Sequence, residues 1–237
     1  NHLLPFVEKV LDLVIARSGN NIKIMTVAPE IEANLNGIPT IRYRGIVVSI
    51  GHTGASADIV TAAIERGATH ATHLFNAMST LGHREPGAVG AILDSDVTAE
   101  LICDGKHIDG RVIRLVYKLI GRERFCMISD DVSTAGMPDG EYVIQGQRVD
   151  IKDGTCTLTD GTLYGNVNSL FFFFFRSVKD FGIPFEDAVY CASAVPSRVL
   201  GIADKKGRID DGMDADLVII NDDFEIKYVI KDGNIIE

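Results

Sequence analysis

Cysteine is scarce in this sequence, and long hydrophobic runs are absent. The four cysteines among the 237 residues are widely spaced and form no C-x-x-C pair; they are Cys103, Cys126, Cys156 and Cys191. This spacing argues against a zinc knuckle or a disulfide framework and fits a reducing cytoplasm. The run LFFFFF at residues 170–175 is far shorter than the roughly 20 residues that cross a bilayer. We therefore expect a soluble, cytoplasmic protein.

Positive charge is also in short supply, with 23 Lys and Arg against 33 Asp and Glu and a formal charge of −10. This balance argues against nucleic acid or an anionic membrane as a partner, so an anionic small substrate needs a local basic pocket. Three motifs are missing: G-x-S-x-G, G-x-x-x-x-G-K-[ST], and G-x-G-x-x-G after a strand. A serine hydrolase, a P-loop enzyme and a dinucleotide enzyme therefore have no support. The chain begins without an initiator methionine or a signal-type segment, and we expect it to start in the middle of a longer one.

Apolar periodicity predicts alternating strands and helices over the first half of the chain. Strands are expected at residues 22–27, in GIVVSIGH, in THATH, at residues 97–103 and in RFCMIS. Helices are expected from Leu3 to about Ser18, between Ser56 and Gly67, and over residues 111–120 with Val112, Val116 and Leu119 as the buried side. This order is typical of a parallel α/β fold, and a doubly wound sheet and a (β/α)₈ barrel both remain open.

The sequence pattern changes in the second half of the chain. Residues 136–163 alternate in short segments split by glycines, which predicts antiparallel hairpins, and helices are expected at residues 169–181 and 186–200. The end of the chain reads as strand, turn, strand, turn, strand, in a separate β-layer. The five phenylalanines at residues 171–175 would cover every face of a helix, so we expect some to be exposed, or shielded by missing parts or a subunit partner.

Chemistry-bearing residues follow four successive predicted strands. They are His52, His73, the segment CDGKH with Asp104 and His107, and Asp130. Ligands gather at the carboxyl ends of strands in parallel α/β folds, so these side chains are expected to share one edge.

His52 and His73 form a candidate metal pair. They are one strand-helix unit apart, which places them on neighbouring strands about 4.8 Å apart, close enough for both imidazoles to share one metal. His70 is three residues before His73 and faces the other way along a strand, so His73 is predicted to be the site residue and His70 a structural partner. A hydrogen-bonded, partly buried role is the commoner alternative for either histidine alone.

Asp130 is the candidate acid/base. It directly follows an apolar strand, and strand parity separates it from Asp131. A carboxylate beside a metal-bound water is the arrangement for hydrolysis, although a solvated turn is the alternative for SDD. Arg84 in GHREPG is a candidate phosphate contact, with an exposed loop arginine as its alternative.

Five motifs in order carry a family resemblance: SIGHTGAS, THLFNAM, GHREPGAVGAILD, ICDGKHID and MISDD. Together they resemble the N-acetylglucosamine-6-phosphate deacetylases of the amidohydrolase superfamily, from TVAPE to GRIDDGMDADLVIINDDFEI. The resemblance implies a metal-bearing (β/α)₈ TIM barrel, here partial, over residues 1–200, with a β-hairpin insertion near residues 141–163. Residues 201–237 would supply C-terminal strands of a small β-sandwich, and the protein would be a homodimer.

The resemblance also assigns roles to individual residues. It makes His52 and His73 ligands of a divalent metal ion, zinc first, with iron, manganese or cobalt as alternatives. It makes Asp130 the catalytic acid/base and His107 the group that polarises the acetyl carbonyl. The implied substrate contacts are Asn76 and Ala77 for the sugar, Arg84 for the phosphate across the dimer interface, Asp104 and His107 as a clamp, and the loop Leu163, Tyr164 and Gly165.

The sequence departs from the family pattern in two ways. The HLEGP segment with the family's metal glutamate is absent, as are the first barrel strands with their H-x-H pair, and Glu30 of APE does not match that glutamate. Asp131 stands where the family usually has a small residue, which would raise the pKa of the neighbouring Asp130. The predicted reaction is metal-dependent removal of the acetyl group from N-acetylglucosamine 6-phosphate, giving glucosamine 6-phosphate and acetate. The alternatives are another amidohydrolase acting on a cyclic amide or amine, or a non-catalytic sugar-phosphate-binding remnant.

Overall fold

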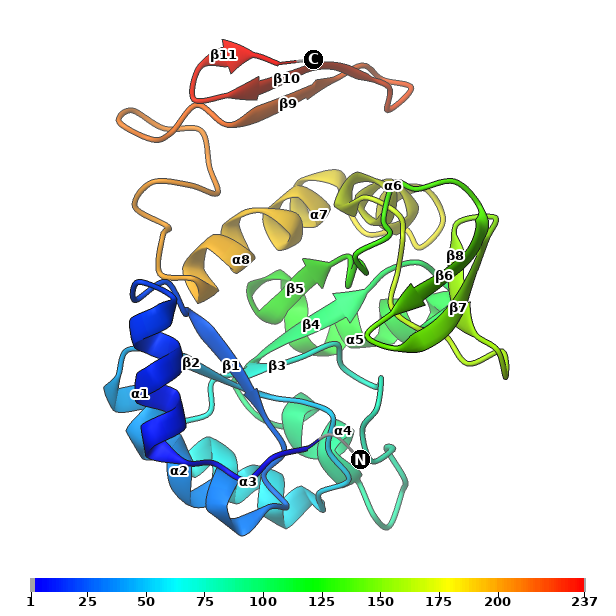
Figure 1. Cartoon of the computed structure of the whole chain (residues 1–237). Coiled ribbons are helices and arrows are strands. Elements are labelled where there is room, and N and C mark those ends of the chain that lie inside the picture. Colours follow the sequence, from blue (N-terminus) through cyan, green and yellow to red (C-terminus); the bar gives the residue numbers. More distant parts are fainter. Residues whose placement is uncertain (1–2, 237) are drawn as a thin grey trace.

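A five-stranded parallel sheet forms the centre of the computed structural model, which describes residues 3–236 (Figure 1). Its strands lie side by side in chain order: β1 (Ile24–Val27), β2 (Val47–Ile50), β3 (His70–Ala71), β4 (Thr98–Ile102) and β5 (Phe125–Ile128). A doubly wound sheet reverses its strand order at a switch point, whereas the wall of a barrel keeps chain order. The sheet is therefore part of an α/β barrel, and the doubly wound alternative is wrong.

Helices connect successive strands and cover the sheet. They are α2 (Glu32–Tyr43), α3 (Ala57–Glu65), α4 (Gly87–Leu93) and α5 (Gly110–Arg124). The predicted start of α3 is confirmed, because the Ser56 hydroxyl accepts a hydrogen bond from the N–H of Ile59 at 3.5 Å. Apolar periodicity did not predict α2 or α4. An internal proline, Pro39, lies in α2, and α4 has only seven residues.

Two predicted apolar faces differ from the structure. The first helix, α1 (Glu8–Arg17), begins later than predicted and buries only Leu11, while Val10 and Val14 are exposed. In α5, Val116 is buried as predicted, but Leu119 is 62% exposed and Ile120 is buried. Ile113, Val116 and Ile120 form one regular helical stripe, so the buried side was predicted with the wrong phase; the break at Gly121 (φ 66°, ψ 174°) comes after this stripe.

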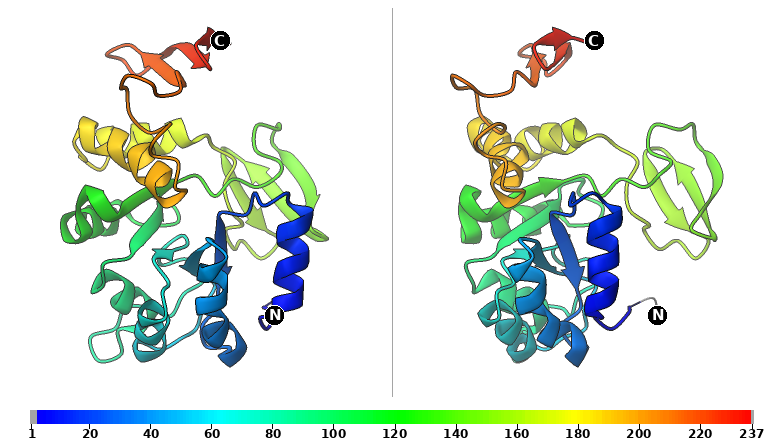
Figure 2. Two further views of the ribbon diagram at one scale, coloured as in Figure 1. Left: turned by 90° about the vertical axis from the view of Figure 1, so that its left-hand side faces the viewer. Right: turned by 60° about the vertical axis from the view of Figure 1, so that its left-hand side comes forward.

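The predicted hairpins are present after β5 as an antiparallel sheet of β6 (Gly140–Ile144), β7 (Gln147–Lys152) and β8 (Thr155–Leu158). Next come α6 (Leu170–Lys179), α7 (Phe185–Ala192) and α8 (Ala194–Val199), which all contact β5. The predicted helix at residues 186–200 is thus two helices, which meet at Ser193. The chain ends in an antiparallel sheet of β9 (Leu217–Ile220), β10 (Ile226–Lys231) and β11 (Asn234–Ile235), which projects from the rest (Figure 2).

The phenylalanine run lies on α6 and is covered by other parts of the same chain. Phe173 and Phe174 are buried, and the other three are half-buried. Phe224, from the turn between β9 and β10, packs against Phe174 and Phe175 with ring centroids 5.9 and 5.6 Å apart. None of the five is fully exposed, and Phe224 of the same chain provides part of the cover.

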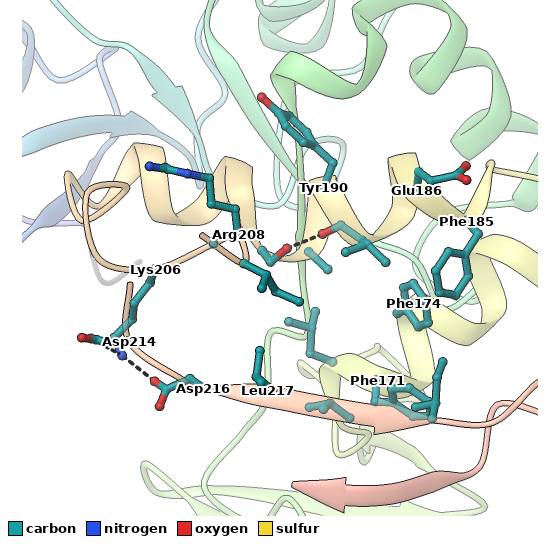
Figure 3. A pocket seen from close by; sticks show the side chains of 18 residues that line it. Phe171, Phe174, Phe185, Glu186, Tyr190, Lys206, Arg208, Asp214, Asp216 and Leu217 are labelled. Atoms are coloured by element: carbon teal, nitrogen blue, oxygen red, sulfur yellow. Dashed lines mark hydrogen bonds and ion pairs between the residues drawn. The ribbon is translucent and has the colours of Figure 1, made fainter. Parts of the chain in front are cut away.

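An apolar cavity of about 680 Å³ lies between α6, α7 and β9 (Figure 3). Phe171, Phe174 and Phe185 gather on one side of it, and Lys206, which pairs with Asp214 at 2.9 Å, lies on the other. None of the predicted site residues lines this cavity.

Two expectations from composition can be compared with the described residues. All four cysteines are buried and free, which agrees with the absence of a disulfide framework. Over residues 3–236, no helix combines the length and the apolar character needed to span a membrane.

Candidate active site

His52 and His73 meet at the carboxyl edge of the sheet. Ser49 pairs with His70 across β2 and β3, and each lies three residues before one of the two histidines, so His52 and His73 stand at the same level. Their Nε2 atoms are 2.9 Å apart, and the rings lie edge to face with centroids 4.6 Å apart. The predicted juxtaposition of the two imidazoles is confirmed. His70 points elsewhere, with its Nε2 2.9 Å from Oε1 of Glu100.

The backbone at this edge is unusual. His52 and His73 have φ values of 48° and 29°, in the left-handed region that non-glycine residues rarely adopt. Gly51, just before His52, is needed for packing, because a Cβ there would lie 2.8 Å from Cβ of Thr72 and 2.9 Å from Cγ2 of Thr26. The close approach of three strands thus requires glycine at this position.

Glu30, which follows β1, holds the loop that carries His52. Its Oε1 accepts the N–H of Gly54 at 2.9 Å, and its Oε2 accepts the hydroxyl of Thr53. Glu30 and His52 line the same hollow of about 880 Å³, together with Leu3, Thr53, Gly54, Ala77, Met78 and Ser79. Glu30 does not match the family's metal glutamate, yet it lies beside His52 in the hollow.

Asn76 and Ala77 lie in the loop after His73. The Asn76 amide donates to the carbonyl oxygens of His73 at 3.2 Å and Leu74 at 3.3 Å, which stabilises its own loop, and its Oδ1 has no hydrogen-bond partner in the described part of the chain. The carbonyl of Ala77 accepts the N–H of Thr53 at 2.9 Å, which ties this loop to the one that carries His52. Ala77 faces the hollow, whereas Asn76 does not line it.

Asp130 follows β5 and also has a positive φ, 56°. Burial and the neighbouring His73 lower the pKa of His52, and the Asp130 carboxylate acts in the opposite direction, so Asp130 lies within electrostatic reach of the histidine pair. Burial first, and then the Asp130 carboxylate, raise the pKa of Asp131. The Asp130 carboxylate therefore disfavours a second charge at Asp131, and the predicted effect of Asp131 on Asp130 stays a prediction.

The loop Leu163, Tyr164 and Gly165 is anchored beside Asp130. The carbonyl of Asp130 accepts the N–H of Asn166 at 2.8 Å, and Val132 donates to the carbonyl of Asn166 at 2.9 Å. Gly165 has φ 61°, and a Cβ there would lie 2.8 Å from the Asp130 carbonyl oxygen, so glycine is required. Tyr164 packs into the small apolar cluster of the hairpin sheet.

Asp104 and His107 form a buried pair. Asp104 accepts the N–H groups of Lys106 and His107 at 2.8 Å, Nδ1–H of His107 at 2.7 Å, and the amide of Asn166 at 3.1 Å. Burial acts to raise the pKa of Asp104, but these hydrogen bonds outweigh it and the pKa lies below its usual value. With its carboxylate enclosed, Asp104 orients His107, whose Nε2 has no hydrogen-bond partner among residues 3–236.

Arg84 is not brought to the hollow. It lies exposed in the loop before α4, and within residues 3–236 no hydrogen bond or ion pair engages its side chain. Its predicted phosphate contact is therefore not assembled by this chain's described residues.

The histidine pair fits two positions of a metal site. Two nitrogens bound to one zinc at about 2.0–2.1 Å in tetrahedral geometry lie roughly 3.3 Å apart, close to the observed 2.9 Å. Burial of His52 favours the neutral imidazole that binds metal. Over the described part of the chain, no group of three or more His, Cys, Asp or Glu side chains is placed to hold a metal ion. Among the described residues, two imidazoles are thus close enough to share a cation, and no third side chain joins them.

Comparisons with known proteins identify the family of this chain. A protein-family model described as Amidohydrolase family matches residues 42–236. The chain is 37% identical to the N-acetylglucosamine-6-phosphate deacetylase of Bacillus subtilis, over 92% of this chain and 55% of that protein. It spans about half to three fifths of the length of the curated relatives it matches.

Solved structures give the same result. The N-acetylglucosamine-6-phosphate deacetylase of Pasteurella multocida matches with a TM-score of 0.91 and 32% identity, over 97% of this chain and 60% of that one. A mutant deacetylase from Mycobacterium smegmatis, in complex with N-acetyl-D-glucosamine-6-phosphate, matches with a TM-score of 0.91 and 30% identity, over 97% of this chain and 61% of that one. The fold, the motifs and these matches agree, and the chain belongs to the amidohydrolase family.

Proposed function

We propose that this site serves the metal-dependent hydrolysis of the acetamide of N-acetylglucosamine 6-phosphate, releasing acetate and glucosamine 6-phosphate. The observation that carries the proposal is the contact between His52 and His73 at the strand ends beside Asp130. It is supported by similarity to deacetylases over more than nine tenths of the chain. Because the chain spans only part of those relatives, activity, substrate and partners are all part of the proposal.

His52 and His73 would hold the divalent cation, zinc first, with iron, manganese or cobalt as alternatives. When bound, such a cation lowers the pKa of water and polarises a carbonyl group. The two imidazoles, whose Nε2 atoms already lie 2.9 Å apart, need little rearrangement to receive it.

Asp130 carries the proton transfers, and His107 polarises the acetyl carbonyl. Hydrolysis breaks the bond between the carbonyl carbon and nitrogen, adds hydroxyl to the carbon, and delivers a proton to the nitrogen. The Asp130 carboxylate would take the proton from water and pass it to the leaving amine. His107 would donate from Nε2 to the acetyl oxygen in its imidazolium form, whose charge the buried Asp104 carboxylate compensates.

The remaining assignments concern substrate binding. Ala77 and Oδ1 of Asn76 would contact the sugar, and Leu163, Tyr164 and Gly165 would close the site beside Asp130. Arg84, exposed in its loop, would reach the phosphate across the interface of a homodimer. A cytoplasmic location fits a phosphorylated sugar substrate and four free cysteines.

The test is direct. The protein is supplied with zinc, iron, manganese or cobalt, and acetate and new primary amine are measured with N-acetylglucosamine 6-phosphate. Asp130→Asn is expected to abolish turnover while sugar-phosphate binding, measured by calorimetry, persists; Asp222→Asn, an exposed aspartate in the turn after β9, serves as the control. Retained turnover in Asp130→Asn contradicts the role assigned to Asp130. Failure to bind stoichiometric metal and to release acetate favours the non-catalytic alternative.

A further inference from the structure

Glu100 and His70 form a buried pair that the proposed reaction does not use. Glu100 lies in β4 and His70 in β3, the neighbouring strand. Nε2 of His70 lies 2.9 Å from Oε1 of Glu100, and their side chains are 1% and 15% exposed. The second oxygen of the same carboxylate, Oε2, accepts the backbone N–H of His73 at 3.2 Å.

The strand register explains how one glutamate reaches both groups. His70 is opposite Thr98 and Ala71 is opposite Ala99, so Glu100 is level with the residue just beyond the end of β3. The carbonyl of Glu100 also accepts the N–H of Leu74 at 2.8 Å. Glu100 therefore holds the chain on both sides of the His73 side chain, where φ is 29° and the backbone needs support.

The position of the proton on His70 follows from the chemistry of the pair. An ionised carboxylate only accepts hydrogen bonds, so Nε2 of His70 donates. Nδ1 of His70 is buried and has no hydrogen-bond partner among the described residues, so a proton there would be a buried donor without an acceptor. The pair is thus fixed in one arrangement, with one carboxylate oxygen on His70 and the other on His73.

We propose that Glu100, anchored by His70, is a positioning residue that sets the His73 imidazole against that of His52. The proposal deepens the proposed function and rests on it only in giving His73 a metal to bind. The positioning itself can be measured without metal or substrate.

Glu100→Gln is the main variant, because glutamine keeps the shape but has one acceptor oxygen for two donors. Amide hydrogen exchange at His73, followed by NMR, is expected to accelerate at least about tenfold, since a charged hydrogen bond is lost. The ring cross-peaks of His73 and His52 are expected to move, while those of the exposed His83 stay in place. Glu65→Gln, at the exposed end of α3, is the matched control and should change neither readout.

His70 provides a rescue test. His70→Leu removes the anchor of Glu100 and should accelerate exchange at His73, whereas His70→Gln still donates an N–H and should restore exchange towards the wild-type rate. Unchanged exchange and unchanged His73 ring signals in Glu100→Gln would overturn the proposal, even if the melting temperature falls or only the His70 ring responds. Glu100→Ala, which has no acceptor at all, must give the same answer as Glu100→Gln.

Zinc affinity separates this proposal from the proposed function. Loss of a polar side chain that orients a metal-binding histidine typically weakens metal binding about 10- to 100-fold. Zinc binding by competition with a chelator should therefore weaken by that factor in Glu100→Gln. If the wild-type chain binds no zinc while the NMR effects persist, the proposed function fails and the positioning role stands. If zinc binds equally to wild type and Glu100→Gln, and the His73 exchange rate and ring signals are the same in both proteins, the positioning role fails.

Discussion

Asp104→Asn tests the geometry of the Asp104–His107 pair with a change of few atoms. Oδ1 of Asp104 accepts the N–H groups of Lys106 and His107, and Oδ2 accepts Nδ1–H of His107 and the amide of Asn166. Asparagine keeps an oxygen towards the two backbone groups and places an NH₂ group towards the other two donors. The side chain of Asp104 is only 3% exposed, so water cannot readily replace the lost acceptor.

The expected loss of stability follows from those contacts. A hydrogen bond to a charged group contributes about 1.5–3 kcal/mol, and an unsatisfied buried donor costs about 1–3 kcal/mol. His107 can move its proton from Nδ1 to Nε2, but the Asn166 amide then still faces a donor. We expect a decrease of about 2–3 kcal/mol in the free energy of unfolding, which lowers the melting temperature of a chain of this size by roughly 4–12 °C.

Turnover should fall together with stability. In the variant no carboxylate compensates an imidazolium at His107, so kcat should fall about 10- to 100-fold with little change in KM. Differential scanning calorimetry and acetate release measure the two effects, with Asp150→Asn on the exposed face of β7 as the control. Because the two side chains act as one unit, His107→Gln and the double variant should be clearly non-additive. Wild-type stability and turnover in Asp104→Asn, or full additivity in the cycle, would refute the reasoning.

Three further predictions use other parts of the structure. The pKa of Asp104 is lower in the folded protein than its ordinary value near 3.8, so its ionised carboxylate stabilises the fold above that pH and this contribution is lost as pH falls through the folded-state pKa. Below about pH 4 the free energy of unfolding should therefore fall more steeply with pH in the wild type than in Asp104→Asn. Arg84→Ala should lower kcat/KM for the phosphorylated sugar at least about tenfold but leave unphosphorylated N-acetylglucosamine and the melting temperature unchanged, and equal loss on both substrates would contradict a phosphate contact. Phe173→Ala, at a fully buried position, should cost about 3–5 kcal/mol in urea unfolding, and half-buried Phe172→Ala distinctly less, whereas equal costs would contradict the packing described for α6.

The pairing of His52 with His73 could be predicted from the sequence because it depends only on strand periodicity. One strand-helix unit brings equivalent positions of adjacent parallel strands to the same level, and the observed pairing of Ser49 with His70 follows that rule. Parity along a strand also separated His73 from His70, which turns to Glu100. The hairpins and the C-terminal strands were predictable for the same reason, since alternation and glycine turns are local signals.

Glu100 and Asn166 were missed, and Glu30 was named but given no role, because their importance comes from contacts between segments distant in sequence. Glu100 sits within the apolar stretch of β4, and its partners are about 30 residues earlier in the chain. Asn166 joins Asp104 to the Asp130 loop across 62 residues. No spacing rule along the sequence predicts such contacts, because they depend on the register of three strands and on which loop folds over their ends. The exposed Leu119 has a more local cause, because apolar residues occupy two neighbouring helical stripes of α5 and periodicity alone did not decide that Ile113, Val116 and Ile120 are the buried one.

Backbone strain concentrates where the chemistry is proposed. Five of the ten non-glycine residues with positive φ in the described chain are His52, His73, Phe75, Ala77 and Asp130, all in loops that follow β2, β3 and β5. Each such residue costs free energy that neighbouring contacts must offset. Glu30 binds the loop of His52, Glu100 binds the N–H of His73, and Asn166 binds the carbonyl of Asp130. Because polar groups from other segments bind the loop of His52, the N–H of His73 and the carbonyl of Asp130, the fold itself supports the backbone that carries the two imidazoles and the carboxylate.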